Sequence, residues 1–175
     1  MRLLIATLVA ITASLLVAGP AQAEPLPPPV VPAPPRSVDL RDFREVANPE
    51  AYTETWRGGS EFVFMTPDGT IACHFLVMAS CSGRIPAIAA TAPGEDEGYG
   101  ECPYVWNPGL TAAEGKPYVF TKTGGTCPPY ERPVLPVGFK LGTEWATCAV
   151  GNDLVVCIDE RNHGFTLEPT GSHAF

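Results

Sequence analysis

The sequence predicts a mainly β fold, a small antiparallel β-sheet or barrel-like domain stapled by three disulfides, with one short N-terminal helix. Two observations predict this class. Short runs rich in Val, Ile, Phe, Tyr and Thr alternate with turn segments, to which the 17 Gly and 20 Pro of the 175 residues contribute. Six cysteines follow an N-terminal segment typical of export, and an even cysteine count in an exported domain indicates a disulfide framework.

Residues 1–23 have the layout of a secretory signal peptide. Arg2 precedes an apolar run from Leu3 to Ala18, and Ala21 and Ala23 are small residues that suit a signal peptidase. An uncleaved membrane span is the alternative, but the run is short for a span and a Gly-Pro break follows it. We therefore expect cleavage after Ala23 and a mature chain without a membrane span, secreted or associated with the cell wall.

Residues 24–36, EPLPPPVVPAPPR, form the clearest low-complexity segment of the chain. Proline fixes φ and lacks an N–H group, so an extended spacer is predicted rather than a helix or a strand. A docking motif for a proline-binding module is the alternative. The remaining residues, 37–175, have the length of a single domain.

The charge of the chain limits its partners. The formal net charge is −8, which repels phosphate backbones and anionic lipid surfaces, so nucleic-acid binding is disfavoured. We expect a monomer whose partner is an envelope component or another secreted protein.

The first element of the domain is predicted to be a short helix. Ser37 or Asp39 can cap its N-terminus, and the Asn48-Pro49 pair is expected to end it after about Val46. Three apolar residues lie at spacings of three on one face of this helix: Leu40, Phe43 and Val46.

Strand patterns begin after this helix. Residues 61–65 and 70–75 flank TPDGT, in which Pro67 and Asp68 suit a type I turn and Gly69 suits the left-handed position that follows, so a hairpin is predicted. Four further strands are predicted, at residues 117–123, 144–150, 154–160 and 164–169.

The last cysteine pair is fixed by hairpin geometry. A two-residue turn at Asn152-Asp153 places Cys148 directly opposite Cys157, at a separation that suits a disulfide. A similar hairpin centred on Val77 pairs the first two cysteines, although its tip lacks turn residues, and the middle two are then left to each other. Of the fifteen pairings that six cysteines allow, we predict the sequential one: Cys73–Cys81, Cys102–Cys127 and Cys148–Cys157.

Other chemistry for these residues is disfavoured. The cysteine spacings do not match a structural zinc site, and an even framework leaves no free catalytic thiol. The chain contains His74, His163 and His173 but no G-x-S-x-G, H-E-x-x-H or P-loop motif. We predict no cofactor, no metal and no catalytic residue; a hydrolase would require His74 or His163 beside a carboxylate in a cleft.

Aromatic residues are the candidate ligand-binding residues. Interleaved with Pro and Gly, they form either a flat platform for a ligand or part of the core, and the core is favoured in a small domain. An exposed apolar hairpin tip at residues 75–78 would be a second contact surface. The aromatic candidates are Tyr104, Trp106, Tyr118, Phe120 and Tyr130.

Several motifs resemble a group of small secreted proteins of mycobacteria and related actinobacteria. The residues that carry this resemblance are F-x-T-P-D-G-x-x-x-C at 64–73, C-x-G-x-x-P at 81–86, L-x-x-G at 135–138, C-A-V at 148–150, V-V-C at 155–157 and H-G-F-x-L-x-P-x-G-S at 163–172. The resemblance implies an exported, disulfide-stapled β-rich domain and brings no catalytic residues. Residues 94–106 depart from the pattern of the group.

The function most consistent with these features is non-catalytic binding of a cell-wall glycan, a lipid or another protein by a secreted or envelope-associated domain. A hydrolase of envelope polymers is one alternative. A purely structural component of the cell wall is the other.

Overall fold

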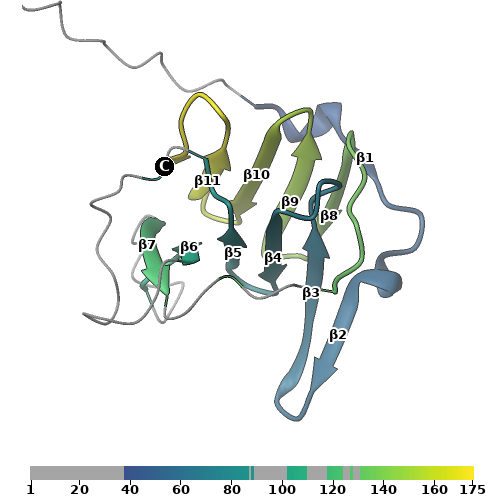
Figure 1. Ribbon diagram of the computed structural model, residues 1–175. Coiled ribbons are helices and arrows are strands. Elements are labelled where there is room, and N and C mark those ends of the chain that lie inside the picture. The colour runs from purple at the N-terminus through teal and green to yellow at the C-terminus, as the bar shows by residue number, and fades with distance from the viewer. Residues whose placement is uncertain (1–37, 87, 89–101, 110–117, 124–126, 128–130) are drawn as a thin grey trace, which may run out of the picture. The chain divides into compact units, whose positions relative to one another are not determined.

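The strands of the computed structural model form two sheets (Figure 1). The structure describes residues 38–86, 88, 102–109, 118–123, 127 and 131–175. The predicted signal peptide, the proline-rich segment and Tyr130 lie outside these residues. Within the described part of the chain, the predicted mainly β fold is confirmed.

One sheet is a meander whose strands pair in chain order, β2 to β7, and every neighbouring pair is antiparallel. Its strands are β2 (Thr53–Trp56), β3 (Gly59–Met65), β4 (Ile71–Phe75), β5 (Ala79–Gly83), β6 (Cys102–Trp106) and β7 (Val119–Thr123).

The other sheet has the strand order β1-β8-β9-β10-β11-β12. Its first pair, β1 with β8, is parallel, and the other pairs are antiparallel. Its strands are β1 (Arg44–Glu45), β8 (Phe139–Gly142), β9 (Ala146–Gly151), β10 (Leu154–Asp159), β11 (Gly164–Leu167) and β12 (His173–Ala174).

A shared apolar core connects the two sheets. Strand β5 contacts both β9 and β10, and the ring of Tyr118 lies edge-on to that of Phe165, with 5.2 Å between the ring centroids. Burying a large apolar side chain contributes about 1.5–3 kcal/mol, so this cluster is a main source of stability. Its fully buried members include Phe64, Phe75 and Val105 from the β2–β7 sheet, and Leu141, Val150 and Phe165 from the other.

The helix predicted up to about Val46 does not form. The structure has a short 3-10 helix there, η1 (Leu40–Asp42), capped by Asp39. The backbone N–H groups of Arg44 and Val46 then donate to carbonyl groups at the start of β8. These sheet bonds replace the bonds that would continue a helix. A second 3-10 helix, η2 (Pro49–Tyr52), begins at the proline that was expected to follow a helix end.

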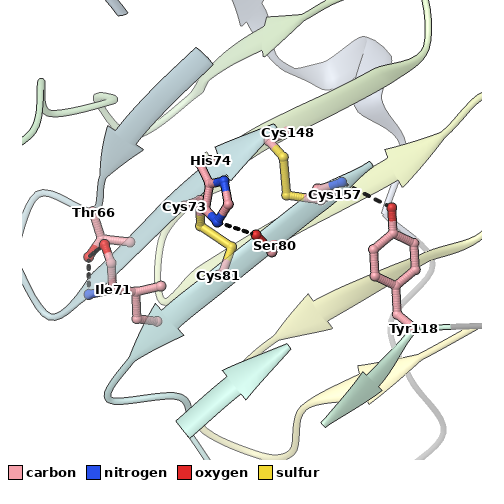
Figure 2. Close-up of a disulfide and its surroundings, with 10 residues drawn as sticks. Thr66, Ile71, Cys73, His74, Ser80, Cys81, Tyr118, Cys148 and Cys157 are labelled. Carbon is pink, nitrogen blue, oxygen red and sulfur yellow. Dashed lines mark hydrogen bonds between the residues drawn. A yellow bond between two sulfur atoms is a disulfide. The ribbon is translucent and has the colours of Figure 1, made fainter. Parts of the chain in front are cut away.

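The predicted disulfides are present, and two of them span directly paired strands. Cys73 pairs with Cys81 across β4 and β5, and Cys148 pairs with Cys157 across β9 and β10, with a Cα–Cα distance of 4.1 Å in each case. Both bridges lie in the buried core (Figure 2). The third bridge joins Cys102 in β6 to Cys127, with a Cα–Cα distance of 4.7 Å.

The three predicted hairpins are also present, and two of their turns have residues with positive φ. Gly69 has a φ of 70°, the left-handed conformation that the TPDGT loop requires, and Asp153 adopts a φ of 54° in the β9–β10 turn. No helix among the described residues is long and apolar enough to cross a membrane.

Candidate functional site

A pocket of about 580 Å³ lies between turns that belong to different sheets. The β3–β4 turn contributes residues 66–71 except Gly69, and the β9–β10 hairpin contributes residues 150–155. This volume lies in the range of small-molecule sites in proteins, about 300–1,000 Å³. The apolar part of the lining includes Ile71, Val137, Val150, Leu154, Val155 and Leu167.

The β3–β4 side of the pocket is held in shape by Asp68. Its carboxylate accepts hydrogen bonds from the hydroxyl groups of Thr66 at 2.5 Å and Thr70 at 2.7 Å, and from the backbone N–H of Thr70 at 3.2 Å. Partial burial raises the pKa of Asp68, but these hydrogen bonds outweigh burial and lower the pKa below its usual value. The carboxylate is therefore a structural acceptor that fixes the turn.

Arg84 is the cation of the pocket. It follows β5 and is exposed, and its backbone N–H donates to the carbonyl of Thr70, which places it next to the β3–β4 turn. Among the described residues, its guanidinium group has no hydrogen-bond or ion-pair partner. The pocket thus combines apolar residues with three charged ones, the acidic residues Asp68 and Asp153 and the cation Arg84, and the guanidinium group of Arg84 can receive an anionic or polar group.

A second constellation lies on the β2–β7 sheet, on the face opposite the core. Nδ1 of His74 is 2.9 Å from a carboxylate oxygen of Glu61, and Nε2 of the same ring is 2.5 Å from the hydroxyl of Ser80. Figure 2 shows the His74–Ser80 bond next to the Cys73–Cys81 bridge. A serine, a histidine and a carboxylate linked in this order have the connectivity of a nucleophile, its base and the group that orients the base.

In the part of the chain that the structure describes, the other two histidines have no such partners. Nδ1 of His163 is 3.9 Å from a carboxylate oxygen of Asp159, which is too long for a hydrogen bond. His173 lies in β12, which pairs with β11. Among the described residues, no group of three or more His, Cys, Asp or Glu side chains is placed to hold a metal ion.

The structure separates the aromatic candidates. Tyr118 retains 2% of its accessible surface and Phe120 packs against the core, so the favoured core interpretation applies to both. Tyr104 and Trp106 are partly exposed and stack at 6.3 Å between ring centroids. None of these four lines the pocket. At the hairpin tip, Phe75 is buried and Leu76 is 41% exposed.

Sequence reasoning did not identify Arg84, Glu61 or Ser80. The predicted hairpin centred on Val77 already places His74 opposite Ser80, so the register contained a signal for that contact. The pocket had no such signal, because its two turns are more than eighty residues apart and meet only when the sheets pack.

No protein-family model, curated protein or solved structure that was compared with the chain matches it.

Proposed function

We propose that the chain is a secreted or envelope-associated domain whose function is non-catalytic binding of a small apolar ligand in the pocket between the β3–β4 and β9–β10 turns, a function separate from any chemistry elsewhere on the domain. The observation that carries this proposal is the pocket itself, with a volume of about 580 Å³ and a lining of which more than half is Val, Leu, Ile and Pro. The three disulfides support a location in an oxidising compartment, because such bonds persist mainly outside the cytosol.

Of the ligand classes considered from the sequence, the lining favours a lipid or a similar apolar molecule over a glycan. Sugar sites usually present aromatic faces, whereas the apolar part of this lining consists of Val, Leu, Ile and Pro, and no aromatic residue is among the described lining residues. The guanidinium group of Arg84, which has no partner among the described residues, adds a position for a carboxylate or other anionic head group.

Binding can be tested with N-phenylnaphthylamine, an uncharged dye that fluoresces in apolar sites. We expect saturable binding to the oxidised protein. Val137→Asp should weaken it at least about tenfold, because a carboxylate would intrude on the apolar lining. Val137 is 44% exposed, so the fold should accept the change. Anilinonaphthalene sulfonate is a similar dye with an anionic group, and it should bind the Arg84→Gln variant more weakly than the wild type.

Two variants control this experiment. Val134 is 45% exposed in the same segment but does not line the pocket, so Val134→Asp should leave dye affinity unchanged. For the sulfonate dye the control variant is Arg161→Gln, which should leave dye affinity unchanged because Arg161 is exposed and lies outside the pocket. Absence of saturable binding, or equal weakening by Val134→Asp and Val137→Asp, would contradict the proposal and favour a structural component of the cell wall.

A further inference from the structure

The register of three adjacent strands places Glu61, His74 and Ser80 on one face of the β2–β7 sheet. His74 in β4 is directly opposite Ser80 in β5. On its other side, His74 is opposite Val63, and Glu61 lies two residues before Val63 in β3, on the same face. Diagonal neighbours across an antiparallel pair remain within reach of long side chains, and Glu61 uses this reach to contact the ring.

When the ring of His74 is neutral, the hydrogen bonds of these side chains determine the direction of each proton. An ionised carboxylate only accepts hydrogen bonds, so Glu61 holds the neutral ring of His74 in the tautomer that carries its proton on Nδ1. Nε2 then has a free lone pair, and the hydroxyl of Ser80 donates to it at 2.5 Å. The Ser80 proton therefore points at a base, as in an activated nucleophile.

The Cys73–Cys81 disulfide keeps this pair in register. His74 follows Cys73 and Ser80 precedes Cys81, so the bridge joins the same two strands one position away, on the core face. A slip of one residue would separate His74 from Ser80 and is blocked by the bridge. The ring of His74 is 48% exposed, whereas Ser80 retains 7% of its surface, so only a small reagent can reach the hydroxyl.

We propose that Ser80 is a nucleophile for small, uncharged acyl donors, with His74 as its general base and Glu61 as the residue that positions His74. In the reaction, the Ser80 oxygen attacks the acyl carbon of an ester and a new O–C bond forms. The Ser80 proton moves to Nε2 of His74, the ester C–O bond breaks, and the leaving alcohol departs with the bonding pair and receives a proton. The products are acyl-Ser80 and the free alcohol.

Two features define the substrate class. The net charge of −8 and the carboxylate of Glu61 disfavour anionic donors. The limited exposure of Ser80 disfavours bulky ones. This activity is separate from the pocket, because Glu61, His74 and Ser80 do not line it.

The test uses nitrophenyl acetate and the oxidised protein, with acetylation followed by intact mass and peptide mapping. We expect acetylation at Ser80 with release of nitrophenolate. His74→Gln should slow it by a factor of about 10²–10⁴, the usual contribution of a general base. Ser82, two residues along the same strand and on the same face, is the internal control, and Ser82→Ala should leave the rate at Ser80 unchanged.

The positioning role of Glu61 has its own readout. In Glu61→Ala, the ring-nitrogen NMR shifts of His74 should change from the Nδ1–H tautomer to a mixture, and acetylation of Ser80 should slow. Near-ultraviolet circular dichroism verifies that each variant is folded, and wild-type protein in urea should lose the preference for Ser80. Acetylation of Ser80 no faster than that of Ser82, or undiminished in folded His74→Gln, would overturn the proposal.

Discussion

Tyr118 places its ring in the apolar core and its hydroxyl group next to the first residue of β5. The hydroxyl accepts a hydrogen bond from the backbone N–H of Ala79 at 3.1 Å, and the ring packs on Phe165 of the opposite sheet. The pKa of Tyr118 is raised to about 12, mainly by burial and also by the negative charge of Asp159. The hydrogen bond from Ala79 opposes this rise. The folded protein therefore resists ionisation of this residue.

This resistance predicts a loss of stability at high pH. In the unfolded chain Tyr118 ionises near pH 10, whereas in the folded protein its pKa is about 12. Between these values the unfolded state releases a proton that the folded state keeps, so the free energy of unfolding should fall by about 1.4 kcal/mol per pH unit. Below pH 10 the contribution is fully present.

Urea titrations of wild type and Tyr118→Phe at several alkaline pH values measure this effect. The variant should be less stable at neutral pH, by about 1–3 kcal/mol, because the Ala79 N–H loses its acceptor. Its stability should then fall less steeply above pH 10 than that of the wild type. Parallel curves for the two proteins would contradict the assignment.

The strands differ in how far their sequence determines them. Two hairpins follow from local signals, because their strands have β-rich patterns and turn residues lie between the paired strands. They pair residues 61–65 with 71–75, and residues 146–150 with 154–159. Strand β1, in contrast, has two residues and pairs with β8, more than ninety positions away. No feature of the local sequence distinguishes this strand from the helix predicted there. The pocket could not be predicted for the same reason, because it forms between turns that are far apart in the chain. The His74–Ser80 contact, in contrast, follows from one hairpin.

Strand β5 ends at a position that admits only glycine. Gly83 has a φ of 127°, and a Cβ atom there would lie 2.1 Å from the carbonyl oxygen of Thr70. Gly83→Ala should therefore lower the free energy of unfolding by roughly 3 kcal/mol or more, since both strain and overlap contribute. Denaturant titration measures the change.

Gly59→Ala is the matched control for this strand end. Gly59 also has a positive φ, of 153°, but a Cβ atom there would meet nothing within 4 Å. Its substitution should cost about 1 kcal/mol through backbone strain alone. Equal losses in the two variants would show that the contact with Thr70 is relieved by small shifts and is not a constraint on β5.

The molecule as a whole depends on its covalent links. One bridge lies within each sheet at the core, and a third holds β6. Loop-closure entropy assigns about 2.5–3 kcal/mol to each short bridge and about 3.5 kcal/mol to the middle one. Their sum of about 9 kcal/mol is comparable with the net stability of a typical domain, about 5–15 kcal/mol.

Reduction should therefore unfold the protein, in a defined order. Cys127 is partly exposed, whereas Cys73, Cys81, Cys148 and Cys157 are buried, so Cys102–Cys127 should be reduced first. The two core bridges should open together with global unfolding. Alkylation and mass mapping at increasing thiol concentration give the order, and thermal melts with and without reductant give the stability. An unchanged melting temperature after complete reduction would contradict this prediction.

Each bridge joins a cysteine to the next one along the chain. A polypeptide that emerges from a ribosome or a translocation channel N-terminus first presents both members of one couple before the first member of the next. A thiol oxidase that links sulfurs in their order of appearance therefore makes only native bonds. Pairing in this order leaves no mispaired intermediates for an isomerase to resolve.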